Sequence, residues 1–168
     1  MGVIFDLDQT LVESLVATQD RRSRNWNTVY SKIPQFKVYD EIIRVLKFLD
    51  EKNIPVCIVT SSPRSYCEKV LSYFGIKVYF CICYHDSRNH KPHPEPIEIA
   101  KDKLINEYGC RSIISIGDTQ ADIIASQKAN VTSIAASWGS EESELLKQTN
   151  AEHIFESPLE LYNWLCSF

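Results

Sequence analysis

The sequence has no long apolar run, no tract rich in proline, glycine and serine, and no excess of basic residues. Its apolar stretches are too short to span a membrane, and the N-terminus does not resemble a signal peptide, so we expect a cytoplasmic protein without a membrane partner. Without a linker-like tract or an internal repeat, residues 1–168 are predicted to form a single domain. The formal net charge of -4 gives no general attraction to nucleic acid, so such a partner would need a local basic patch.

Disulfides are not expected, although the chain contains 6 cysteines. Most of them lie in apolar runs, where a reduced thiol packs like a small hydrophobic side chain. The spacing of Cys81, Cys83 and His85 could serve a zinc ion. Alternate residues of a strand with one face toward the core explain the same spacing equally well, so the sequence leaves a metal at these residues open.

The apolar stretch Val3–Leu7 is predicted to form a buried strand. It contains one carboxylate, Asp6, and is followed by another, Asp8. Two carboxylates this close suit a hard cation such as Mg²⁺, and they also suit a nucleophile paired with a general acid. An acidic turn that ends a strand is the alternative interpretation.

Apolar strands alternate with helical segments along the chain after residue 38. We expect strands over residues 54–59, 77–84, 112–116, 131–135 and 153–155, and helices over residues 40–52, 63–74, 97–108, 143–147 and 158–166. This alternation predicts an α/β fold with a three-layer, doubly wound parallel sheet.

Polar side chains follow several of the predicted strands. Besides Asp6 and Asp8, they include Thr60, Ser61, Lys91, Asp118 and Asp122. Because ligands of such sheets bind beyond the carboxyl ends of the strands, we expect these groups to share one site.

Each of these later clusters also has a simpler interpretation or a local reason for its position. Thr60 and Ser61 precede a helix and predict an anion-binding corner, although a plain helix N-cap fits them too. Lys91 comes directly before a proline and is held on extended backbone. Asp118 and Asp122 can face one point at a helix start, or they can simply cap that helix.

Residues 12–38 show weak periodicity and are expected to form a short insertion with one or two small helices. Arg21, Arg22, Arg24 and Trp26 make this the most basic and aromatic part of the chain. Such a patch can bind a phosphate, a base or a sugar. A solvated helix face with one anchoring tryptophan is the alternative.

The chain resembles the haloacid dehalogenase (HAD) superfamily in four motifs that occur in the same order. The motifs are Phe5-Asp6-Leu7-Asp8-Gln9-Thr10, then Thr60, then Lys91-Pro92-His93-Pro94, and finally Gly117-Asp118-Thr119-Gln120-Ala121-Asp122. The resemblance implies a phosphatase-type hydrolase with a Rossmann-like core and a small cap insertion at residues 12–38.

The resemblance also implies a role for each motif residue. Asp6 would attack phosphorus and become an aspartyl-phosphate, with Asp8 as general acid and then general base. Thr60, Ser61 and Lys91 would hold the phosphoryl group. Mg²⁺ would be bound by Asp6, the backbone carbonyl of Asp8, Asp118 and Asp122, the last directly or through water.

The chain departs from the family pattern in two places. Gln9 stands where the family usually has glycine, and its side chain could narrow the turn or contact the leaving group. The insertion is shorter than many family caps and excludes water poorly by itself. This favours a bulky substrate, such as a nucleic-acid end or a phosphoprotein, or a lid from a partner subunit. Arg21, Arg22, Arg24 and Trp26 would then face the leaving group.

The sequence therefore predicts a Mg²⁺-dependent phosphomonoester hydrolase. A phosphotransferase or mutase is one alternative, although it would need a tight cap to keep water from the aspartyl-phosphate. A non-catalytic binding module of the same fold is another. The sequence determines neither the substrate, which could be a small molecule or a macromolecular end, nor the oligomeric state.

Overall fold

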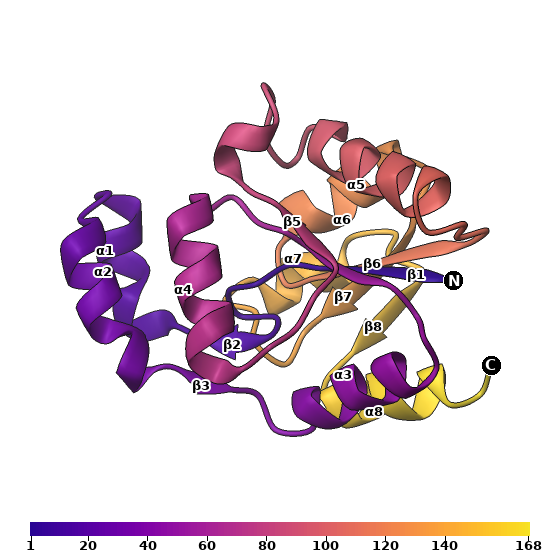
Figure 1. Cartoon of the computed structure of the whole chain (residues 1–168), viewed down its shortest axis with the longest axis horizontal. Coiled ribbons are helices and arrows are strands. Elements are labelled where there is room, and N and C mark those ends of the chain that lie inside the picture. The colour runs from indigo at the N-terminus through magenta and orange to yellow at the C-terminus, as the bar shows by residue number, and fades with distance from the viewer.

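Six parallel strands form the central sheet of the computed structural model, which describes residues 1–168, in the order β5-β4-β1-β6-β7-β8 (Figure 1). The strands are β1 (Gly2–Phe5), β4 (Val56–Val59), β5 (Phe80–Ile82), β6 (Ile113–Gly117), β7 (Thr132–Ala136) and β8 (His153–Phe155). β1 lies in the interior of the sheet, between β4 and β6. The predicted doubly wound α/β class is confirmed.

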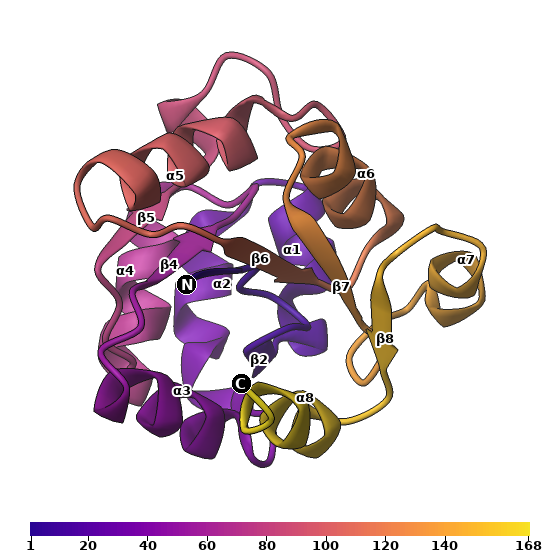
Figure 2. The ribbon, with the colours of Figure 1, turned by 90° about the vertical axis from the view of Figure 1, so that its right-hand side faces the viewer.

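Helices cover both faces of the sheet (Figure 2). One face packs against α3 (Ile42–Glu51), α4 (Arg64–Phe74) and α8 (Pro158–Leu165), and the other against α5 (Glu95–Asn106) and α6 (Gln120–Lys128). Successive residues of a strand point to opposite faces, so Val3 and Phe5 join the first layer and Ile4 joins the second. The short helix α7 (Ser143–Lys147) packs Leu146 in a small separate cluster.

The insertion after β1 begins and ends in a two-stranded antiparallel sheet of β2 (Val12–Glu13) and β3 (Lys37–Val38). Between them lie the 3-10 helix η1 (Leu15–Ala17), α1 (Thr18–Arg22), α2 (Trp26–Lys32) and the 3-10 helix η2 (Ile33–Gln35). We call residues 12–38 the cap; that it acts as a separate unit stays a prediction. The cap lies beside α4 (Figure 1), where Trp26 and Tyr66 have ring centroids 5.8 Å apart.

Three predicted strands, at residues 3–7, 54–59 and 77–84, are longer than the observed ones. The strand predicted at 77–84 is wrong in extent, because only residues 80–82 pair and a 3-10 helix, η3 (Tyr84–Asp86), follows. Its end is set locally, since the Cys83 amide donates to the Asp86 carboxylate at 2.7 Å. The first strand ends at Phe5 because the chain turns, with the Leu7 carbonyl accepting from the Leu11 amide at 3.0 Å.

The structure also bears on the cysteines and on the membrane. None of the helices has the length and apolar character that a membrane span requires. All six cysteines are free, and four of them are buried. No group of three or more His, Cys, Asp and Glu side chains is arranged to hold a metal ion, and this includes Cys81, Cys83 and His85. The zinc interpretation therefore has no support in the structure.

Candidate active site

The carboxyl ends of β1, β4 and β6 lie at one edge of the sheet because these strands are in register. Phe5 is level with Ile58 on one side and Ile116 on the other. The side chains that follow these strands line a single cavity of about 720 Å³. Every residue predicted for the site lines it: Asp6, Asp8, Gln9, Arg22, Arg24, Trp26, Thr60, Ser61, Lys91, Asp118 and Asp122.

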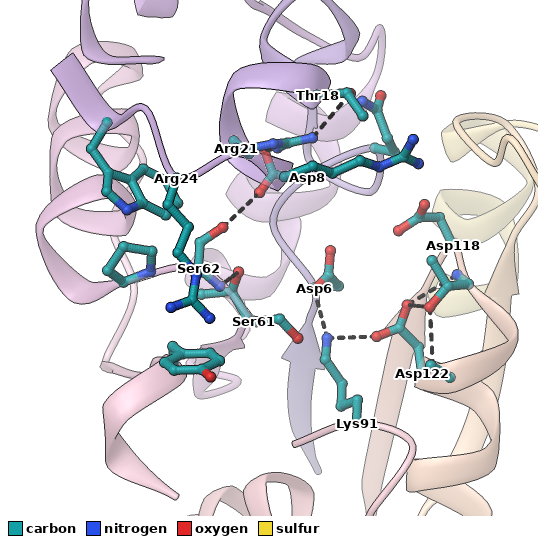
Figure 3. Close-up of a pocket in the computed structure, with 18 of the residues that line it drawn as sticks. Asp6, Asp8, Thr18, Arg21, Arg24, Ser61, Ser62, Lys91, Asp118 and Asp122 are labelled. Atoms are coloured by element: carbon teal, nitrogen blue, oxygen red, sulfur yellow. Dashed lines mark hydrogen bonds and ion pairs between the residues drawn. The ribbon is translucent and has the colours of Figure 1, made fainter. Parts of the chain in front are cut away.

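Lys91 lies between two carboxylates at the floor of this cavity (Figure 3). Its Nζ is 2.6 Å from Asp6 Oδ1 and 2.5 Å from Asp122 Oδ1, and it donates to the Val59 carbonyl at 3.0 Å. Burial acts to lower the pKa of Lys91, but the carboxylates of Asp122 and Asp6 outweigh it and raise the pKa above its usual value. The lysine is therefore a fixed positive charge.

The carboxylates around the floor of the cavity outnumber the single ammonium of Lys91. Burial, followed by repulsion from Asp6 and Asp122, raises the pKa of Asp118 to about 9. Burial likewise raises the pKa of Asp6 to about 6, although Lys91 acts against it. Carboxylates that repel one another in a buried site favour a bound cation, and oxygen donors are those that Mg²⁺ prefers.

The donor set fits Mg²⁺, although it does not form a complete protein cage. No three of these side chains are arranged to hold an ion by themselves. Mg²⁺ commonly uses one or two carboxylates and takes its remaining ligands from water and substrate phosphates. Asp6 and Asp118 can provide such a partial set.

Asp122 has both of its oxygens engaged within the protein. Besides the contact of Oδ1 with Lys91, Oδ2 accepts from the amide and the hydroxyl of Thr119 at 2.9 and 2.6 Å. Thr119 and Asp122 thus form a capping box at the start of α6, as the helix-cap interpretation expected. A side chain at Gly117 would collide with Asp122, since an added Cβ would lie 2.4 Å from its Cβ.

Asp8 points away from Lys91 and toward the cap (Figure 3). Its Oδ1 accepts from the hydroxyls of Ser14 at 2.6 Å and Tyr66 at 2.5 Å, and it also pairs with the guanidinium of Arg21. Its Oδ2 accepts from Ser62 at 3.3 Å. The turn after Asp6 therefore places the two carboxylates of the first motif in different surroundings.

Sequence reasoning missed three of these contacts with Asp8. The sequence does not predict Ser14, Ser62 and Tyr66 as site residues. It predicts that Arg21 faces the leaving group, whereas the structure pairs its guanidinium with Asp8. Tyr66 gave no signal because it occupies a core position of α4, with 0% of its surface exposed. Burial raises the pKa of Tyr66 to about 12, so the phenol stays a hydrogen-bond donor at neutral pH.

The hydroxyls after β4 do not cap α4. Thr60 is buried, and its Oγ1 accepts from the Ser62 amide at 3.1 Å. The N-cap residue of α4 is Pro63, and no side chain accepts a hydrogen bond there. The plain N-cap interpretation of Thr60 and Ser61 is therefore wrong, and Ser61 is exposed to the cavity.

Gln9 adopts a left-handed backbone conformation, with φ 62°. Its side-chain carbonyl accepts from the Tyr39 hydroxyl at 2.9 Å, and Gln9 is 5% exposed. Gly139 packs against the backbone of this turn so closely that an added Cβ would lie 1.8 Å from the Gln9 carbonyl oxygen. The turn that carries Asp8 is therefore held from two sides.

The cap contributes the basic and aromatic wall of the cavity. Arg22 and Arg24 are exposed, and neither forms an ion pair with a carboxylate. The Arg24 guanidinium carbon lies 5.9 Å from the centre of the Tyr84 ring. Trp26 is half-buried and also packs against Tyr30, with ring centroids 6.4 Å apart, so it anchors the cap as well as lining the cavity.

The parallel sheet, the carboxylates at its edge and the buried Lys91 match the class of hydrolases that the four sequence motifs indicate. The sequence profile of the family described as haloacid dehalogenase-like hydrolase matches residues 16–136. The chain belongs to this family.

Named relatives support the same assignment. Pyrophosphatase PpaX of Oceanobacillus iheyensis is 30% identical over 153 residues, which are 89% of this chain and 68% of that protein. Phosphoglycolate phosphatase of Escherichia coli is 24% identical over 122 residues, 71% of this chain and 48% of that protein. The chain thus spans between about half and two thirds of these two relatives.

Solved structures share the fold along nearly the whole chain. A protein described as a predicted phosphoglycolate phosphatase from Haemophilus somnus superposes with a TM-score of 0.81 at 19% identity, covering 98% of this chain and 97% of that one. A hydrolase from Pseudomonas syringae gives 0.79 at 21% identity, covering 100% and 99%. Together the comparisons confirm the predicted family, fold and enzyme class, a phosphatase-type hydrolase.

Proposed function

We propose that the protein is a Mg²⁺-dependent phosphohydrolase that acts on a small phosphorylated compound through an aspartyl-phosphate on Asp6. The observation that carries the proposal is the buried Lys91, which contacts Asp6 and Asp122 at the floor of a cavity that Asp118 also lines. Phosphoryl transfer requires in-line positioning and positive charge around the transferred oxygens. This edge of the sheet offers a carboxylate nucleophile beside a fixed positive charge.

Asp6 supplies the nucleophile in this proposal. With a pKa of about 6, its carboxylate is mostly ionised at neutral pH, and only its Oδ1 contacts Lys91. Attack on phosphorus forms the aspartyl-phosphate, while Asp8 gives a proton to the departing oxygen. Water then attacks the same phosphorus as Asp8 takes its proton, and the carboxylate of Asp6 is restored.

The phosphoryl oxygens are held by Lys91, Thr60 and Ser61, which line the cavity beside Asp6. A bound Mg²⁺ would supply further positive charge to these oxygens. Asp6, Asp118 and the backbone carbonyl of Asp8 would hold it. Because both oxygens of Asp122 are engaged, we assign this residue a contact through water.

A cavity of about 720 Å³ supports a small substrate. The two relatives, a pyrophosphatase and a phosphoglycolate phosphatase, make pyrophosphate and phosphoglycolate the first compounds to test. Arg22 and Arg24, exposed on the cap without acidic partners, are proposed to bind a negatively charged leaving group. A bulky substrate, a nucleic-acid end, a partner lid and the cytoplasmic location stay predictions.

The test is phosphate release from these two compounds and from sugar phosphates, nucleotides and phosphopeptides, with Mg²⁺ and with EDTA. We expect metal-dependent release and at least an about 1000-fold loss in Asp6→Asn. Asp102→Asn, on the exposed side of α5, is the matched control. Full activity of folded Asp6→Asn, or no release by a folded protein that binds Mg²⁺, would overturn the proposal.

A further inference from the structure

Tyr66 brings a polar atom into a helix face that is otherwise apolar. The neighbouring buried residues of α4 are Cys67, Val70 and Leu71. The Tyr66 ring packs against the rings of Trp26 and Phe36, with centroids 5.8 and 6.4 Å away, and its hydroxyl donates to Asp8 Oδ1 at 2.5 Å. The core thus fixes a donor against the carboxylate that the proposed reaction uses for proton transfer.

The two oxygens of Asp8 have unequal surroundings. Oδ1 faces the hydroxyls of Ser14 and Tyr66 and the guanidinium of Arg21. These three donors exceed the two lone pairs of one carboxylate oxygen, so Oδ1 has no capacity for a further donor. Oδ2 has only the longer contact with Ser62, drawn as a dashed line in Figure 3. One oxygen is therefore held by the protein, and the other is available to the contents of the cavity.

We propose that Tyr66 is a positioning residue that, together with Arg21, fixes Oδ1 of Asp8 and leaves Oδ2 as the oxygen that exchanges protons. This inference rests on the proposed function. When the bond from phosphorus to the leaving oxygen breaks, its electron pair stays on that oxygen, which takes the proton from Oδ2. When water attacks the aspartyl-phosphate, Oδ2 takes a proton from that water, and the electron pair of the phosphorus–Asp6 bond returns to Asp6.

Tyr66 is better suited than Ser14 to fix the angle of the carboxylate. A serine hydroxyl rotates readily, whereas the ring of Tyr66 is buried between two other rings and its oxygen has one position. Arg21 Nη1 also lies 3.3 Å from this phenol oxygen and 2.8 Å from Ser14 Oγ. Arg21 therefore connects the cap to both hydroxyls that hold Asp8.

The test replaces Tyr66 by phenylalanine, which keeps the ring and removes only the hydroxyl. A poor leaving group needs the proton from Asp8, whereas p-nitrophenolate leaves with little help. We expect kcat/KM of Tyr66→Phe to fall about 10- to 100-fold on glycerol phosphate and by less than about 3-fold on p-nitrophenyl phosphate. Tyr108→Phe, a half-buried tyrosine outside the cavity, is the matched control and should match the wild type on both.

Arg21→Gln provides a second variant if Tyr66→Phe folds poorly. It removes the charge and leaves the core intact, and we expect a loss of about 5-fold that is again confined to the poor leaving group.

Two outcomes would overturn the inference. An equal loss of Tyr66→Phe on both substrates would show that Tyr66 acts through packing, and no loss would show that Asp8 is positioned without it. A wild type that releases no phosphate overturns the proposed function and this inference together, whereas an active wild type with unaffected variants overturns only the inference.

Discussion

The two walls of the cavity hold their charges in opposite ways. On the core wall, the side chains of Asp6, Lys91 and Asp122 are 11%, 6% and 6% exposed, and each contacts an opposite charge. On the cap wall, Arg22 and Arg24 are exposed and have no acidic partner. A buried charge without a partner is costly, whereas an exposed one is hydrated.

This difference predicts different roles for the two walls: the core wall supports folding and chemistry, and Arg22 and Arg24 on the cap wall bind a ligand. The core charges are bound to one another, so replacing one of them must affect both the stability of the fold and the chemistry. Arg22 and Arg24 bind no carboxylate within the protein, so replacing them should affect only a ligand. Three predictions test this separation, first at the core charges, then at the cap arginines, and last at a single bound proton.

Replacing Lys91 by methionine should have the largest effect, because it leaves Asp6 and Asp122 buried beside each other without their shared cation. We expect the free energy of unfolding to fall by about 3–5 kcal/mol. We also expect kcat to fall by about 100- to 1000-fold, since a group that stabilises the transition state is lost. Urea unfolding measures the free energy of unfolding, and phosphate release measures kcat. Lys77→Met, at an exposed lysine, is the control, and an unchanged unfolding midpoint in Lys91→Met would contradict the buried pairing.

Replacing Arg22 and Arg24 together by alanine should leave the fold intact. We expect KM to rise about 10-fold, or about 1.4 kcal/mol, on a substrate with a charged leaving group. Turnover of p-nitrophenyl phosphate should change little, and the free energy of unfolding should stay within about 0.5 kcal/mol of the wild type. The double variant Arg111→Ala and Lys128→Ala removes two exposed charges elsewhere. An equal rise in KM on both substrates would place the arginines at the phosphoryl group instead.

The third prediction concerns a single bound proton. Burial first, and then repulsion from Asp6 and Asp122, raises the pKa of Asp118 from 3.8 to about 9, so at about pH 7 the metal-free folded protein holds a proton that the unfolded chain has lost. Its free energy of unfolding should therefore fall as the pH rises between about 4 and about 9, and Mg²⁺ should flatten this dependence. Calorimetric titration with Mg²⁺ in buffers of different ionisation enthalpy should show release of about one proton at about pH 7. Binding without proton release would mean that Asp118 does not ligate the ion.

The sequence was most informative where the chain alternates between buried strand and amphipathic helix. The predicted segments 143–147 and 153–155 coincide with α7 and β8, and the fold class followed from the alternation. The alternation also predicted one shared edge for Asp6, Thr60 and Asp118, because parallel strands in register bring their carboxyl ends together. These are consequences of local periodicity and topology.

Contacts between side chains far apart in the chain were not predictable in this way. Tyr66 contacts Asp8 across 58 residues, and its place on an amphipathic helix is that of any core residue. The length of β5 was overestimated because a local contact between Cys83 and Asp86 ends the strand, which apolar periodicity does not record.

The interior place of β1 has a consequence for synthesis on the ribosome. β1 directly precedes the proposed nucleophile Asp6 and is the first strand of the sheet in the sequence. One of its two neighbours in the sheet, β6, begins only at Ile113. During translation, one edge of the apolar segment Val3–Phe5 therefore stays unpaired until β6 has left the ribosomal exit tunnel. Pairing between such distant segments is slow, and an exposed apolar strand tends to aggregate. The growing chain is thus most vulnerable at the strand that directly precedes Asp6.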